Sequence, residues 1–87
     1  MMINRSEFLS RMQLDDVTLD VWVVDEWLLP QQVEDGVVFT DADLARAQLI
    51  LELQRDLGVN REGVDVILNL LDQLHGLRQA LAEKMRR

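Results

Sequence analysis

The last third of the chain carries a long amphipathic pattern that restricts the fold more than any other feature. From Arg61 to about Lys84, after the N-cap type residue Asn60, large apolar side chains recur at steps of three and four residues, as in coiled coils. A first row is formed by Ile67, Leu70, Leu74, Leu77 and Leu81, and a second by Val64, Leu68 and Leu71. The pattern predicts one long helix with two apolar sides.

Two apolar rows on one helix need two surfaces to cover them. One row can pack on the chain's own core, which leaves Leu74, Leu77 and Leu81 to contact a second copy. A helix of roughly 24 residues spans about 36 Å, more than so small a domain is expected to cover. We therefore expect a homodimer held by these three leucines. The alternative is that both rows face the chain's own core.

A second helix is predicted just before the long one, from Asp41 to Leu57. Thr40 and Asp43 form a Thr-x-x-Asp capping pattern at its start, and Gly58 suits the position after its end. Its apolar residues define a broad inward face, with charged and amide side chains outside. The expected inward residues are Leu44, Ala47, Ile50, Leu51, Leu53 and Leu57, and the expected outer ones are Arg46, Gln48, Glu52 and Arg55.

Two shorter helices are predicted in the first 27 residues. Ser6 is a suitable N-cap for a helix from Glu7 to Met12. After the cap-type pair Asp15-Asp16, residues 18–27 carry apolar groups at helical spacing. The same segment is rich in β-branched and aromatic residues, so local preference alone favours a strand almost equally.

A small hairpin is predicted between the second and third helices. Pro30 ends the preceding segment, and Glu34-Asp35-Gly36 offers turn chemistry within residues 31–39. The expected class is therefore all-α, with helices around one tiny wing. We divide the single expected domain into a helical unit with the wing, residues 1–58, and a C-terminal dimerisation helix, residues 59–87.

Charge is distributed unevenly along the chain. Residues 1–45 carry ten acids and two bases, a net charge of −8, whereas residues 46–87 have a net charge of +1. A polyanion such as DNA, RNA or an anionic membrane surface would be repelled by the first half. A basic protein surface would be attracted to it. Solubility alone is the other explanation of this acidity.

The residue types needed for catalysis or metal binding are missing or scattered. The chain has no cysteine and only one histidine, His75, which is expected on the surface of a helix. Its carboxylates fall at turns and helix starts, its glycines form no phosphate-binding loop, and Ser6 and Ser10 lack a triad-like context. We expect a protein that is not an enzyme and that uses no metal or cofactor.

Without cysteine the chain has no disulfide framework, and nothing in its sequence indicates an oxidising compartment. The longest apolar runs have four to five residues, far fewer than the ~20 of a membrane helix, and the first 25 residues lack a signal-peptide pattern. The sequence therefore predicts a cytoplasmic protein that is neither exported nor embedded in a membrane.

The order of these elements resembles the winged helix-turn-helix of the MerR superfamily. More closely, short motifs along most of the chain resemble the chaperone-modulator family CbpM. These motifs are Trp22, Glu26-Trp27-Leu28-x-Pro30, Val38-Phe39-x-Asp41 with Ala45-Arg46, Leu53-x-x-Asp56-Leu57-Gly58-Val59, Gly63-Val64, and Leu70-Leu71-Asp72-Gln73-Leu74 with Leu77-Arg78. Their order and spacing, more than any one motif, carry the resemblance.

The resemblance implies a partner and an activity. Members of that family bind the J-domain of a DnaJ-like (CbpA-like) co-chaperone and block its work with the Hsp70 chaperone. A J-domain presents a basic helix to Hsp70, so an acidic competitor is electrostatically reasonable. The resemblance thus implies a stoichiometric, non-enzymatic inhibitor.

The alternative is a DNA-binding transcriptional regulator of the MerR type. Such regulators carry a Thr-Leu-Arg-Tyr-Tyr-like pattern on their second helix, and this chain has Thr-Leu-Asp-Val-Trp at residues 18–22. Their wing carries arginine around an Asn-Gly turn, whereas this wing has Glu34-Asp35-Gly36. Positive charge is missing from both DNA-contacting elements, which makes nucleic acid an unlikely partner.

The second helix is the expected partner-binding element. Leu19, Trp22 and Trp27 are expected in the core, because large apolar groups at helical spacing normally build the core of a small domain. The residues left on the other side, Asp20, Val21, Val24 and Asp25, are the candidate contacts. Gln13 and Glu26 stand where the resembled family has turn glycines, which predicts altered turns there.

Overall fold

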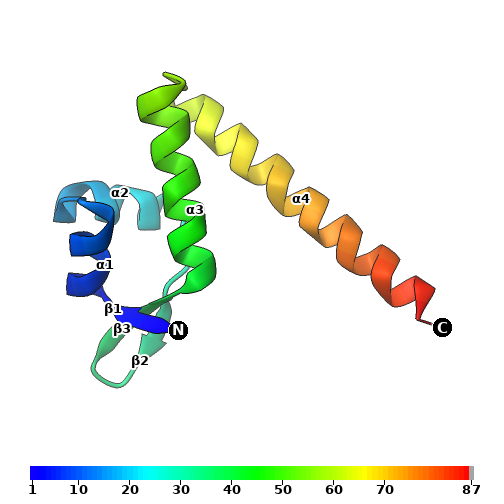
Figure 1. Ribbon diagram of the computed structural model, residues 1–87, viewed down its shortest axis with the longest axis horizontal. Helices are drawn as coiled ribbons and strands as arrows, with labels where there is room; N and C mark the ends of the chain where they lie inside the picture. The colour runs from blue at the N-terminus through cyan, green and yellow to red at the C-terminus, as the bar shows by residue number, and fades with distance from the viewer. Residues whose placement is uncertain (87) are drawn as a thin grey trace.

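The computed structural model describes residues 1–86 and shows a compact N-terminal part from which one long helix projects (Figure 1). In chain order the elements are β1 (Met2–Asn4), α1 (Arg5–Met12), α2 (Asp16–Val24), β2 (Gln31–Val33), β3 (Gly36–Thr40), α3 (Asp41–Leu51), the π-helical segment η1 (Glu52–Asp56) and α4 (Arg61–Met85). The last residue of the predicted C-terminal unit, Arg87, lies outside the described residues.

The three strands form one antiparallel sheet in the order β1-β3-β2. The β2–β3 hairpin is the predicted wing, and Val33 pairs with Gly36 across its turn. The additional strand, β1, pairs Ile3 with Phe39 and was not predicted. A three-residue segment before the first helix has too short a pattern to reveal a strand. The class all-α is therefore only approximately right.

Both short helices begin at side-chain caps. The Asn4 side chain accepts a hydrogen bond from the backbone N–H of Glu7 at 2.8 Å, so α1 begins at Arg5. The predicted N-cap, Ser6, lies inside the helix, and that prediction is wrong. Asn4 is the N-cap instead, because its side chain accepts the hydrogen bond of a first-turn backbone N–H, that of Glu7.

The second helix is confirmed as a helix, although its sequence also suits a strand. The Asp15 side chain accepts a hydrogen bond from the backbone N–H of Thr18 at 2.9 Å, and α2 then runs to Val24. This cap and the burial of Leu19 and Trp22 outweigh the poor local preference. Trp27, predicted as its last residue, lies beyond its end but is buried as expected.

Two non-glycine residues adopt left-handed backbone conformations. Gln13, between α1 and α2, has a φ of 54°, and Glu26, after α2, has a φ of 61°. Each costs about 1 kcal/mol relative to glycine. The sequence predicted altered turns here because Gln13 and Glu26 replace glycines of the resembled family. That prediction is wrong, since both residues keep the left-handed conformation that glycine favours.

The core lies between the sheet, α1, α2 and α3. Phe8 and Phe39 stack with ring centroids 4.3 Å apart, and the two tryptophans, Trp22 and Trp27, lie 6.4 Å apart. Side chains from every helix complete this buried cluster, which consists of Ile3, Phe8, Leu19, Trp22, Trp27, Leu28, Phe39, Ala47, Ile50, Leu51, Leu53, Val64 and Leu68.

The start of α3 follows the predicted capping box. Thr40 and Asp43 exchange side-chain and backbone hydrogen bonds, and this reciprocal cap joins the sheet to the helix. The predicted helix ends as η1, and Gly58 then has a φ of 65°, as a residue after a helix end requires. Leu57 was expected inside but is exposed, because the π-helical turn shifts the helical register before it.

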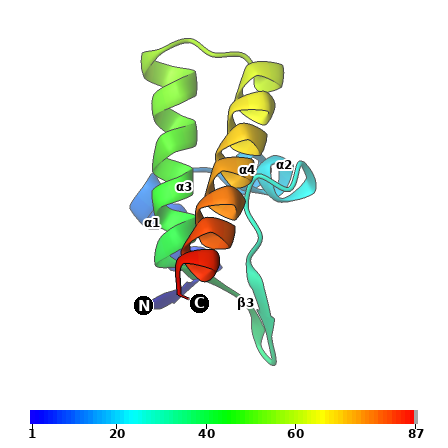
Figure 2. The same cartoon turned by 90° about the vertical axis from the view of Figure 1, so that its right-hand side faces the viewer.

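The long helix α4 begins after Asn60, whose side chain caps it through the backbone N–H of Gly63. Figure 2 shows the loop that joins the end of the α3–η1 segment to the start of α4, and Figure 1 shows that α4 then diverges from α3, with its far end extending away from the rest of the molecule. Within the described residues, no helix is both long and apolar enough to cross a membrane.

Candidate protein-binding surfaces

The outward face of α2 is largely apolar. Leu19 and Trp22 point into the core, which leaves Val17, Asp20, Val21 and Val24 on the opposite side of the helix. Val17 and Val24 are 71% and 79% exposed, and Val21 is 40% exposed. We call Val17, Val21 and Val24 the valine row. Three of the four predicted contact residues thus lie on this face.

Val17 is the member of the valine row that sequence reasoning missed. It precedes the segment in which the helical series was counted, so it was not included on the outer face. Its position three residues before Asp20 and seven before Val24 could have placed it there, because residues at those spacings share one side of a helix.

Asp20 is exposed and paired with Arg5. The Arg5 guanidinium donates hydrogen bonds to Asp20 at 2.8 Å and to the side chain and backbone carbonyl oxygens of Asp16. Arg5 therefore joins the start of α1 to the acidic side of α2. The Asp20 side chain keeps 67% of its surface in contact with solvent, so this predicted contact residue is accessible.

The fourth predicted contact residue, Asp25, caps the end of α2 and is covered by Arg61. Its carboxylate accepts two hydrogen bonds from Arg61, at 2.9 and 2.5 Å, and its side chain is only 14% exposed. The same pairing raises the pKa of Arg61 above its ordinary value. Asp25 was expected on the solvent side because the sequence does not reveal that α4 returns to cover the end of α2.

Two further polar contacts hold α4 against the segment after α2. The Trp27 indole N–H donates to Asp65 at 3.1 Å, and Arg46 donates to both carboxylate oxygens of Asp72 at 2.6 and 3.0 Å. Arg46 also donates to the Trp27 carbonyl oxygen. Arg46 was predicted outside but is half-buried, because this bridge draws it between α3 and α4. The Arg46 hydrogen bonds lower the pKa of Asp72.

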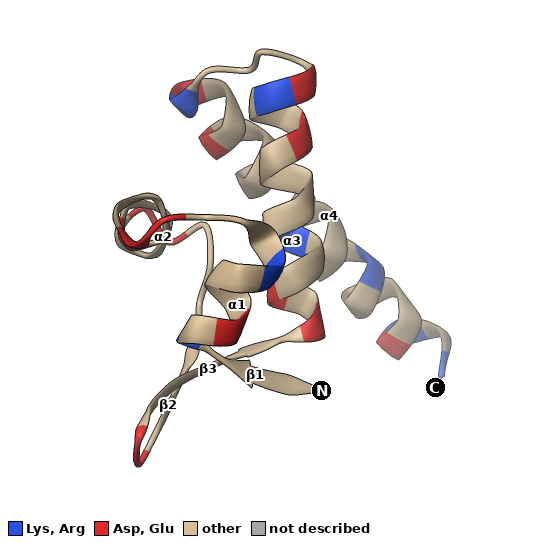
Figure 3. Ribbon diagram, turned by 60° about the vertical axis from the view of Figure 1, so that its left-hand side comes forward, with Lys and Arg blue, Asp and Glu red and all other residues tan. Residues whose placement is uncertain are grey.

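The acidic residues gather on the wing as well as on α2. Figure 3 shows acidic residues along α2 and at the tip of the β2–β3 hairpin, where Glu34 and Asp35 are exposed. In a winged helix-turn-helix these two elements are the ones that face a bound duplex. Here the exposed charged residues of α2 and the wing are all acidic, and Arg5 of α1 compensates part of the charge on α2.

From Val66 to Met85, α4 presents a continuous apolar side to solvent. Val64 and Leu68 are buried and Leu71 is half-buried, so the second predicted row packs on the core as expected. The exposed side consists of Val66, Leu70, Leu74, Leu77, Leu81 and Met85, which are 41–78% exposed. The three predicted dimer residues all belong to it.

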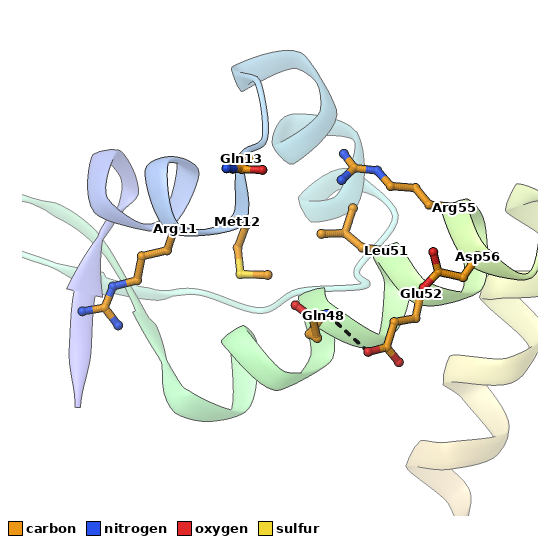
Figure 4. Close-up of a pocket in the computed structure, with 8 residues that line it drawn as sticks. All are labelled: Arg11, Met12, Gln13, Gln48, Leu51, Glu52, Arg55 and Asp56. Carbon is orange, nitrogen blue, oxygen red and sulfur yellow. Dashed lines mark hydrogen bonds between the residues drawn. The ribbon is translucent and has the colours of Figure 1, made fainter.

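A hollow of about 250 Å³ lies between the turn after α1 and η1 (Figure 4). Its lining mixes charges of both signs with two apolar side chains, Met12 and Leu51, and Gln13 lies opposite Arg55 across it. No three His, Asp or Glu side chains among residues 1–86 are close enough together to hold a metal ion. His75 is exposed on α4.

Comparison with known families agrees with this architecture. A family model described as MerR HTH family regulatory protein matches residues 3–87. The chain therefore belongs to the MerR helix-turn-helix regulatory family. Searches of curated proteins and of solved structures find no match.

Proposed function

We propose that this protein is a non-enzymatic, cytoplasmic chaperone modulator that binds the J-domain of a DnaJ-like co-chaperone and inhibits its action with Hsp70. The observation that carries the proposal is the outward face of α2, where a DNA-binding relative would place basic residues and this chain places the valine row beside Asp20. An apolar centre with a charged rim is typical of protein interfaces.

The electrostatics favour a basic protein partner over nucleic acid. A duplex binds through phosphate contacts made by Lys and Arg, and their absence from the exposed parts of α2 and the wing removes most of that affinity. A basic helix would instead meet Asp20 and the wing acids, which would accelerate and orient its approach.

The second candidate is a DNA-binding regulator of the MerR type. The family match favours it, because the matching model describes regulatory proteins with this helix-turn-helix. It requires an electropositive face spanning α2 and the wing. Two arginines that contact α2 or its cap, Arg5 and Arg61, already form ion pairs with carboxylates there and so cannot supply that face without breaking those pairs.

Calorimetric titration with the J-domain of the DnaJ-like protein from the same organism tests the proposal. We expect saturable binding that weakens with added salt. Asp20→Arg should weaken it with an unchanged circular dichroism spectrum, whereas the matched control Asp56→Arg, which makes the same charge change on η1, should not. Absence of J-domain binding together with salt-sensitive binding to a DNA duplex would favour the second candidate.

We also propose that α4 forms a homodimer through its exposed apolar side. Counted from the bond between His75 and Gly76, the six exposed residues lie at equal intervals in both directions, as Leu74 with Leu77, Leu70 with Leu81, and Val66 with Met85. An antiparallel two-fold helix pair needs this spacing, because each residue then meets a different residue of the partner and the reverse contact repeats it.

The charges of α4 support the same orientation. Residues 61–75 carry three acids and one base, and residues 76–86 carry one acid and three bases. An antiparallel pair places the acidic half of one helix beside the basic half of the other, whereas a parallel pair places like charges together.

Cysteine pairing tests this orientation, because the natural chain has no cysteine. Mixing the Leu70→Cys and Leu81→Cys variants under oxidising conditions should give disulfide-linked heterodimers, with little linkage in either variant alone. Linkage of each variant to itself would show a parallel pair. A monomer in sedimentation analysis of the natural chain would exclude the dimer.

A further inference from the structure

The acidic residues at both ends of α2 are already occupied by arginines of the same chain. Arg5 pairs with Asp16 and Asp20 near the start of the helix, and Arg61 pairs with Asp25 after its end. The valine row therefore lies between two intramolecular arginine–carboxylate pairs. A basic partner that docks on this row meets carboxylates whose charge is partly compensated.

The two arginines differ in how they are held. Arg5 is two-thirds buried and also donates to the Asp16 backbone carbonyl oxygen, so it is part of the contact between α1 and α2. Arg61 has 63% of its side chain in solvent and lies on the 14% exposed Asp25 carboxylate. Arg61 thus covers Asp25 from the outside. Within residues 1–86, the Arg61 side chain donates hydrogen bonds to Asp25 alone.

We propose that Arg61 is an internal stand-in for a cationic side chain of the partner, which displaces it from Asp25 when the partner docks on α2. The inference rests on the proposed function and adds a built-in competitor to it. A guanidinium held by two hydrogen bonds to a carboxylate has the geometry with which an arginine of another protein would bind there.

Displacement of Arg61 does not require α4 to unfold or detach. The Asn60 side chain caps the helix through the backbone N–H of Gly63, independently of the Arg61 side chain. Asp65 and Asp72 keep α4 attached through Trp27 and Arg46, and Val64 remains in the core. An exposed arginine can therefore swing into solvent while the backbone beneath it stays in place.

The exchange also gives selectivity. A cation of the partner replaces the contact with Asp25 that Arg61 gives up, so the exchange of one cation for another is close to neutral. Only a partner that brings a cation beside an apolar surface gains the burial of the valine row in the same event. A small cation or a uniformly basic surface would break the internal pair without that gain.

The test compares affinities for the J-domain in four variants: Arg61→Gln, Arg55→Gln, Asp25→Asn, and Asp25→Asn combined with Arg61→Gln. Arg61→Gln removes the competitor and should tighten binding about two- to fivefold, the effect of an ion pair whose cation is largely in solvent. Arg55→Gln makes the same charge change at an arginine that forms no ion pair within the described residues, and should show only the smaller long-range effect. In the Asp25→Asn background, Arg61→Gln should give no gain.

Each outcome decides a different point. Equal affinities of Arg61→Gln and Arg55→Gln would overturn the stand-in role while leaving J-domain binding intact. A gain that persists in the Asp25→Asn background would also overturn it, because the cause would then be a loosened α4. Absence of binding by the natural chain would refute the proposed function, and the stand-in role with it.

Discussion

The helices α2 and α4 both leave apolar residues in solvent, but they do so differently. On α2 the exposed apolar surface is three valines within nine residues, next to carboxylates that are held by arginines. On α4 it is six residues, five of them larger than valine, spread symmetrically over 20 positions. A short row with charged flanks suits a partner that binds and leaves, whereas a long self-complementary row suits a permanent contact.

The largest expected effect is at the centre of the α4 row. Leu77→Asp places a charge in two symmetric positions of the proposed dimer and removes leucine burial worth about 1.5–3 kcal/mol per copy. We expect at least a hundredfold weaker self-association, measured by sedimentation equilibrium. J-domain affinity per monomer should stay unchanged. If that affinity also fell, the surfaces on α2 and α4 would not be separate.

Changes in the valine row of α2 should weaken J-domain binding and leave self-association unchanged. Val17→Ser combined with Val24→Ser removes the two most exposed valines and should weaken J-domain binding about tenfold, if each loses roughly 0.7 kcal/mol of burial. Leu29→Ser is the matched control, because Leu29 is as exposed as Val17 but lies outside α2. Self-association should be the same in all three proteins. Equal binding by the double variant and the control would remove the valine row from the interface.

A smaller effect is expected at the junction of the sheet and α3, which belongs to neither row. Thr40→Ala removes one side of the capping box and should lower the free energy of unfolding by about 1 kcal/mol. Urea denaturation at fixed protein concentration measures it. Thr40 belongs neither to the valine row nor to the exposed side of α4, so J-domain affinity and self-association should match those of the natural chain under folding conditions. A change in one of these affinities would link the corresponding surface to the packing of α3.

The fold could be predicted where a local signal is strong. Thr40 with Asp43, Gly58 and Asn60 mark helix ends through side-chain or backbone chemistry that depends on near neighbours, and all three act as predicted. The strand β1 could not be found in this way, because Ile3 gains its place only by pairing with Phe39, 36 positions along the chain. Leu57 was misplaced because a π-helical turn has no simple apolar spacing.

In the candidate site, too, residues fixed by local helical geometry could be predicted, and those that depend on distant contacts could not. Val21 and Val24 follow from helical geometry once Leu19 and Trp22 are assigned to the core. Asp25 could not be placed, since its burial depends on Arg61, which lies far along the sequence and reaches it only through the path of α4. Ion pairs between distant elements leave no periodic signature, so the sequence overestimated the exposed acidity of α2.

The smallest expected effect concerns the attachment of α4 to the domain that carries α2. The Arg46 hydrogen bonds lower the pKa of Asp72 in the folded state below its ordinary value near 4. The pair therefore contributes its stability fully above about pH 4, and this contribution is lost as the pH falls through the folded-state pKa. The Asp72 side chain is half-exposed, so solvent screening keeps the contribution small.

Urea denaturation of the natural chain and of Asp72→Asn, at equal protein concentration, measures this contribution. At pH 7 the natural chain should be slightly more stable, and the difference should shrink toward zero as the pH falls below the folded-state pKa, because a protonated Asp72 no longer attracts Arg46. A difference that stays constant with pH would mean that the bridge acts by packing alone. In that case apolar contacts, chiefly those of Val64 and Leu68, would hold α4 to the domain that carries α2.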